Sequence, residues 1–178
     1  MKTGVYPLCK KDSLVYQIGL IFLFSFFMVI SSYSRIPLWF TPVPITLQTF
    51  VLYLSILFLK EKSFFSQAIY ITLGILGVPV FGNVGAGLGY FFGPTGGYLL
   101  GFLLVSIIFP RFLPQKKSFI KLFFYFLFAN FFIYILGMSW LIFGFEFTFY
   151  KSLLLGVFPF LIGDIFKIVL VSALALKK

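Results

Sequence analysis

The composition of this 178-residue chain excludes a water-soluble globular domain, because 61% of its residues are hydrophobic and only 10% are charged. The net charge of +10 does not indicate nucleic-acid binding, since the basic residues lie between apolar segments and do not form one stripe. The chain has no histidine and one cysteine, Cys9, which excludes intrachain disulfides, histidine general bases, and thiolate or histidine metal sites. We therefore predict an integral membrane protein that is not an enzyme and holds neither a metal nor a cofactor.

Apolar segments follow one another along the whole chain. The first apolar run, 14–30, follows a basic start and superficially resembles a signal peptide, but it is long enough to span a membrane, lacks a convincing cleavage site and is followed at once by further apolar segments. We predict an all-α bundle of about six transmembrane helices in a single domain, 1–178, with spans at 14–34, 45–59, 63–78, 96–113, 119–143 and 152–176.

A proline-rich turn leads into the second predicted span, with the sequence TPVPITLQT at 41–49. Prolines fix φ, so this entry is expected to be stiff. Thr46 and Gln48 are its candidate polar contacts and are expected to point different ways. A hydrogen bond between helices and a contact with a ligand are equally good interpretations of Gln48.

Between the third and fourth spans, segment 81–98 contains seven glycines and no charge. A loop this apolar is expected to fold back over the outer face of the bundle, with Phe91 and Phe92 acting as a lid or wedge. The glycine spacing does not match a phosphate-binding loop, and no lysine follows. Asn83 is the only amide side chain in the segment.

The fourth and fifth spans offer few polar side chains. Gly93, Gly97 and Gly101 form a small-residue stripe that permits close helix packing. The fifth span is rich in phenylalanine, mostly expected to face membrane lipid. Its candidates for polar contact are Asn130, Tyr134 and Trp140.

Two charged residues interrupt the last apolar segment. Asp164 lies twelve residues from either end of 152–176, and Lys167 follows at i+3 on the same helical face. Each charge would cost roughly 2.5 to 3.5 kcal/mol near the bilayer midplane if it stood alone. The two residues either form an ion pair that serves packing alone or line a cavity for a polar ligand, and the second interpretation is favoured.

The distribution of basic residues predicts the orientation. The N-terminus, the turn at Lys60, the loop at 111–121 and the C-terminus together carry eleven Lys and Arg, whereas the opposite side carries Arg35 and Lys151. Both termini are therefore expected in the cytoplasm, with the 41–48 turn and the Gly-rich loop on the outer face.

Three motifs follow one another over nearly the whole chain and read TPVPITLQT at 41–49, GPTGGYLLGF at 93–102 and PFLIGDIFK at 159–167. In their sequence and their order they resemble the BioY family, the biotin-binding substrate-capture (S) subunits of energy-coupling-factor vitamin transporters. The resemblance implies a six-helix bundle in a bacterial plasma membrane that binds biotin from outside. It also implies partnership with a transmembrane coupling protein and cytoplasmic ATPase subunits.

The chemistry of biotin suits this set of residues, with biotin as the transported ligand. Its cyclic urea has two N–H donors and one carbonyl acceptor, which Asp164, Lys167 and Asn83 complement. Aromatic residues would cover the rings, and Arg35 would meet the carboxylate or else anchor a lipid headgroup. The candidate binding residues are Asp164, Lys167, Asn83, Gln48, Thr46, Tyr98, Thr95, Phe92, Tyr90 and Arg35.

Alternatives remain open at this point. S subunits usually carry Ala-x-x-x-Ala on the first helix for docking, whereas here Gly19, Ser25 and Ser31 are six apart and make no single stripe. A solitary biotin transporter is therefore possible, as is an S component for another small vitamin. A membrane-embedded enzyme using Asp164 and Lys167 is disfavoured, because no histidine, second nearby carboxylate or activated nucleophile accompanies them.

Overall fold

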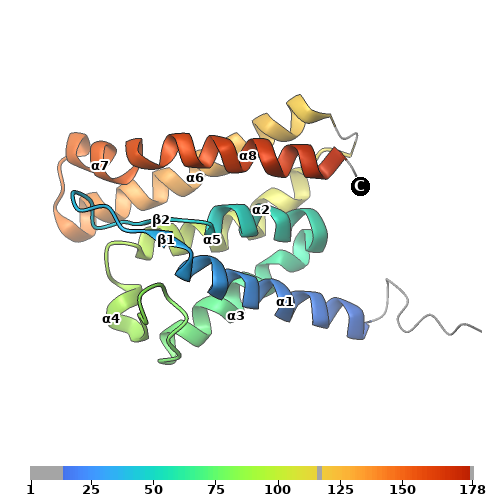
Figure 1. Ribbon diagram of the computed structural model, residues 1–178, viewed down its shortest axis with the longest axis horizontal. Coiled ribbons are helices and arrows are strands. Elements are labelled where there is room, and N and C mark those ends of the chain that lie inside the picture. Colours follow the sequence, from blue (N-terminus) through green and yellow to red (C-terminus); the bar gives the residue numbers. More distant parts are fainter. Residues whose placement is uncertain (1–13, 116–117, 177–178) are drawn as a thin grey trace, which may run out of the picture.

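A computed structural model describes residues 14–115 and 118–176. Its main helices run roughly along the long axis of the molecule and form a bundle (Figure 1). They are α1 (Leu14–Tyr33), α2 (Gln48–Leu59), α3 (Ser63–Ile75), α5 (Gly96–Ile108), α6 (Phe119–Phe145), α7 (Phe149–Gly156) and α8 (Leu161–Leu176). The smaller elements are β1 (Arg35–Ile36), β2 (Ile45–Thr46), α4 (Gly87–Phe91) and 3-10 turns at Lys60–Lys62, Phe109–Phe112 and Phe158–Phe160.

The surface of the bundle is that of a membrane protein. Within the described residues, three helical stretches are long and apolar enough to cross a membrane, namely Leu14–Tyr33, Phe119–Phe145 and Phe149–Leu176. Large apolar side chains such as Phe22, Phe124 and Phe166 are exposed on these helices, where a soluble protein would place charges. The prediction of an all-α membrane protein is confirmed.

Helix α2 begins three residues later than the predicted second span. Residues Ile45–Thr46 are extended and pair antiparallel with Arg35–Ile36, in the register Arg35 to Thr46 and Ile36 to Ile45. Prolines at 37, 42 and 44 account for this, since each fixes φ and disfavours helix at the residue before it. The 41–49 motif therefore runs through the second strand of this ribbon into the first turn of α2.

The predicted sixth span is not one continuous helix. Helix α7 ends at Gly156, and Pro159 lies in the 3-10 turn that separates α7 from α8. The hydroxyl of Tyr98 donates to the carbonyl of Gly156 at 2.7 Å, so α5 supplies a partner for one carbonyl at the break. Asp164 consequently lies in the first turn of α8, where the helix dipole favours a negative charge.

The elements that connect the helices gather at the two ends of the bundle. One end carries the described start of α1, the Lys60–Lys62 turn, the end of α5, the start of α6 and the end of α8 (Figure 1). The β1–β2 ribbon, the segment around α4 and the α6–α7 turn lie at the other end. The basic residues used to predict orientation that fall outside the described residues are Lys2, Lys10, Lys11, Lys116, Lys117, Lys177 and Lys178.

Gly97 sets the distance between α5 and α6. A Cβ placed on Gly97 would lie 2.3 Å from the Cβ of Trp140 and 2.6 Å from the carbonyl oxygen of Leu136. Because the second contact is with backbone, the helices themselves must move. We expect Gly97→Ala to lower the unfolding free energy by about 1 to 3 kcal/mol, measured as a lower melting temperature in detergent. Gly19→Ala is the matched control, because a Cβ there meets no atom within 4 Å; equal melting of the two variants would contradict this packing.

Candidate functional site

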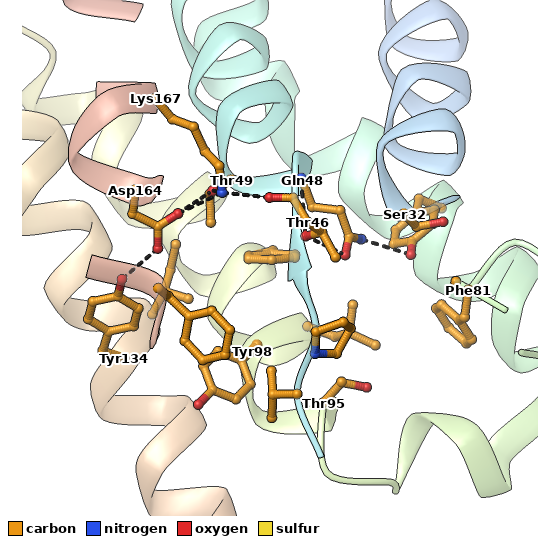
Figure 2. Close-up of a pocket in the computed structure, with 18 of the residues that line it drawn as sticks. Ser32, Thr46, Gln48, Thr49, Phe81, Thr95, Tyr98, Tyr134, Asp164 and Lys167 are labelled. Carbon is orange, nitrogen blue, oxygen red and sulfur yellow. Dashed lines mark hydrogen bonds and ion pairs between the residues drawn. The ribbon is translucent and has the colours of Figure 1, made fainter. Parts of the chain in front are cut away.

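A cavity opens near the ribbon end of the bundle, where segments far apart in the sequence converge. It contains about 670 Å³ of empty space, counting its open mouth. Its walls come from the end of α1, the ribbon and start of α2, the Gly-rich segment, α5, α6 and α8 (Figure 2). Asp164 and Lys167 lie on one side of it, and Ser32 and Phe81 lie on the other.

The Asp164 carboxylate accepts hydrogen bonds from four side chains of the protein. Its Oδ1 accepts from the Thr49 hydroxyl at 2.9 Å and from the Lys167 ammonium at 2.8 Å. Its Oδ2 accepts from the Tyr134 hydroxyl at 2.5 Å and from the Asn130 amide at 3.4 Å. A carboxylate has about four lone-pair positions, so a donor from a ligand reaches Asp164 only by replacing one of these bonds.

The Lys167 ammonium is equally well satisfied. It donates to Asp164, to the Thr49 hydroxyl at 3.2 Å and to the backbone carbonyl of Thr46 at 2.5 Å. The whole Asp164 residue is only 4% exposed and Lys167 only 7%. Removing one partner of such a buried pair strongly destabilises the folded protein. The pair therefore meets the requirements of a packing role, while its position in the cavity wall keeps the ligand-binding role open.

A second polar group lies beside the pair in the cavity wall. The Gln48 amide donates to the Tyr70 hydroxyl on α3 at 2.9 Å, which is the bond between helices that one interpretation expected. Gln48 also lines the cavity, and its Oε1 accepts from the Thr46 hydroxyl at 3.3 Å. Thr46 and Gln48 thus contact each other, because Thr46 ends the ribbon and does not belong to helix α2.

Aromatic rings and one hydroxyl supply the rest of the wall. Tyr98 is wedged between α6 and the α7–α8 break, since a Cβ at Gly137 would lie 2.3 Å from its ring. Phe81 stacks on Tyr90 with ring centroids 5.2 Å apart. Burial raises the pKa of Tyr90 above its ordinary value. Its hydroxyl donates to the carbonyl of Gly82 at 3.1 Å. Thr95 also lines the cavity and is seen below Tyr98 in Figure 2.

Seven of the ten predicted binding residues line this cavity, and three do not. The lining residues are Asp164, Lys167, Gln48, Thr46, Tyr98, Thr95 and Tyr90. Asn83 is exposed at the tip of a tight turn closed by the Phe81–Gly85 bridge, with φ of 66°. Phe92 is 58% exposed and stacks on Trp140, whereas its neighbour Phe91 is buried in the core. Arg35 is half-buried on β1 and packs against Gly82.

Several residues of the site were not predicted from the sequence. Thr49 bonds both charged residues, and its place in the TPVPITLQT motif was an available signal. Asn130 and Tyr134 were noted only as polar residues of the fifth span, although their i+4 spacing puts them on one face of α6. Ser32, Phe81 and Phe160 also line the cavity. Phe160 stands in the PFLIGDIFK motif, whereas no motif marks Ser32 or Phe81.

Comparisons with known proteins identify the family to which this chain is similar. The model of the BioY family matches residues 7–178. The biotin transporter BioY of Thermotoga maritima is 35% identical over 161 residues, covering 87% of this chain and 90% of the relative. The biotin transporter BioY2 of Lactococcus lactis is 33% identical over 168 residues, covering 93% and 91%.

A solved structure is similar along nearly the whole chain. It is the crystal structure at 2.1 Å of the S-component for biotin from an ECF-type ABC transporter, with a TM-score of 0.82 and 26% sequence identity. The match covers 94% of this chain and 92% of the other. Because the family match covers almost all of the chain and the cavity lies within it, this protein belongs to the BioY family.

Proposed function

We propose that this chain is a membrane subunit that binds biotin in the cavity beside Asp164 and Lys167 and mediates its uptake. The observation that carries the proposal is a cavity in a BioY-family chain whose wall combines a buried ion pair with aromatic rings. Such a wall suits a ligand with a polar head and an apolar body. The protein is a transport subunit and not an enzyme.

Binding involves an exchange of hydrogen bonds. The urea N–H groups of biotin are donors, and its urea oxygen is an acceptor. One N–H replaces a protein donor on Asp164, and the urea oxygen takes over one donor of Lys167, so the number of hydrogen bonds made by the pair is kept. Tyr98 and Tyr90 pack against the ring system, with Thr46, Gln48 and Thr95 completing the polar contacts.

The subunit works in a bacterial plasma membrane with partners. We place both termini in the cytoplasm and the cavity mouth outside, following the excess of Lys and Arg on the other side. A transmembrane coupling protein and cytoplasmic ATPase subunits supply the energy, as the similarity to an S-component of an ECF-type ABC transporter supports. The sequence has no Walker motif, so the isolated chain is expected not to hydrolyse ATP.

The orientation is tested with single cysteines at two exposed positions, Leu88 and Gln115, after replacing Cys9. We expect Leu88→Cys to react with a membrane-impermeant maleimide added to intact cells. Gln115→Cys should react only after the cells are opened, because it lies at the end that carries the basic links. Labelling of both positions from the same side would contradict the orientation.

Transport is tested by uptake of radiolabelled vitamins into cells that lack their own biotin uptake. We expect accumulation of biotin that is recovered chemically unchanged, with no accumulation of other small vitamins from a panel. Expression with and without a coupling module shows whether the subunit needs one. Uptake of a different vitamin, or recovery of altered biotin, would overturn the proposal.

A further inference from the structure

A chain of buried hydrogen bonds reaches Asp164 from behind the cavity wall. The hydroxyl of Tyr53 on α2 donates to Oδ1 of Asn130 on α6 at 2.7 Å. The Nδ2 of Asn130 donates in turn to Oδ2 of Asp164 on α8 at 3.4 Å. Tyr53 is fully buried and Asn130 is 3% exposed, and neither belongs to the lining of the cavity. They therefore lie behind the residues that line the cavity.

The direction of this chain follows from the chemistry of the amide. The side chain of Asn130 has an acceptor at one end and a donor at the other. If the amide turned over, its oxygen would face the Asp164 carboxylate, which has only acceptors when ionised. The Tyr53 hydroxyl supplies a donor for the oxygen in the observed orientation. Tyr53 thus holds Asn130 with its donor towards Asp164.

From this geometry we infer that Tyr53 and Asn130 are positioning residues for biotin binding. They hold Oδ2 of Asp164 together with Tyr134, while Thr49 and Lys167 hold Oδ1. The carboxylate is then fixed in orientation by α2, α6 and α8 at once, and ligand binding does not have to order it. This inference rests on the proposed function, because biotin affinity is the property on which the positioning acts.

The test is a double-mutant cycle read by biotin affinity in detergent. Tyr53→Phe keeps the ring that packs on Phe126 with centroids 4.9 Å apart and removes only the hydroxyl. We expect Tyr53→Phe and Asn130→Leu each to weaken biotin binding roughly tenfold. This is the lower end of the loss in affinity typically seen at metal sites when a residue that hydrogen-bonds a ligating side chain is replaced. Since Tyr53 acts through Asn130, the double variant should bind no more weakly than Asn130→Leu alone.

Tyr125→Phe is the matched control. Tyr125 also lies on α6 outside the cavity lining, and its hydroxyl donates to the carbonyl of Phe109 at 2.7 Å. Its loss should lower the melting temperature without changing the affinity. If Asn130→Leu does not fold, Tyr53→Phe decides alone.

Two results would overturn the positioning role while leaving biotin binding intact. One is a folded Tyr53→Phe variant that binds within twofold of the parent, and the other is full additivity of the two losses. Failure of the parent itself to bind biotin would instead overturn the proposed function, and with it this inference.

Discussion

Asp164→Ala is expected to weaken biotin binding by roughly two to four orders of magnitude. The substitution leaves the Lys167 ammonium buried without its counter-charge and removes the shared acceptor of Thr49, Tyr134 and Asn130. Truncating one partner of a buried hydrogen-bonded charge pair at a binding interface typically costs about 2 to 5 kcal/mol of binding free energy, which gives this range of affinity. Isothermal titration of the folded, monodisperse variant against biotin measures the loss.

Two comparisons make the Asp164 result specific. Glu61→Ala removes an exposed carboxylate near the opposite end of α2 and should leave the affinity unchanged. Desthiobiotin keeps the urea and loses mainly packing, so the parent should bind it more weakly by only about 1 to 3 kcal/mol. If Asp164→Ala binds biotin within a few-fold of the parent, the Asp164–Lys167 pair serves packing alone.

Lys167→Met is expected to be nearly as damaging as Asp164→Ala. It leaves the ionised carboxylate of Asp164 buried with only neutral donors and releases the backbone carbonyl of Thr46. The double variant Asp164→Asn with Lys167→Met removes both charges while keeping side chains of similar length. We expect it to recover much of the melting temperature lost in Lys167→Met, because no uncompensated charge remains.

The affinity of the double variant separates the two roles of the pair. If the pair contacts biotin, the double variant stays as weak as Lys167→Met even though its stability returns. A double variant that is stable and binds like the parent would contradict a ligand-binding role. Biotin titrations and thermal melts on the same preparations give both quantities.

Sequence reasoning located the chemistry of the site best where polar residues interrupt apolar runs. A carboxylate and an ammonium at i+3 in an apolar segment have no stable place except beside a polar partner, and the structure brings Asp164 and Lys167 together at 2.8 Å. The TPVPITLQT motif similarly indicated a stiff entry into α2. Both signals are local, so neither depends on knowing the fold.

The remaining parts of the site depend on how distant segments meet. Asn83 was favoured because it is the only amide of its segment, but a tight turn places it outside the cavity, exposed. Tyr53 lies in an apolar run in which nothing distinguishes it, and its role follows from a bond to Asn130, 77 positions away. The break between α7 and α8 likewise depends on Tyr98 of α5 as well as on Pro159.

The most direct test of biotin binding beside the Asp164–Lys167 pair is an experimental structure of the purified chain with biotin. We predict the ligand within the cavity, with its urea ring within hydrogen-bond distance, about 3 Å, of Asp164 or Lys167 and its rings against Tyr98 and Tyr90. Biotin bound elsewhere on the chain, with the bonds of Asp164 to Thr49, Lys167, Tyr134 and Asn130 unchanged, would contradict the account.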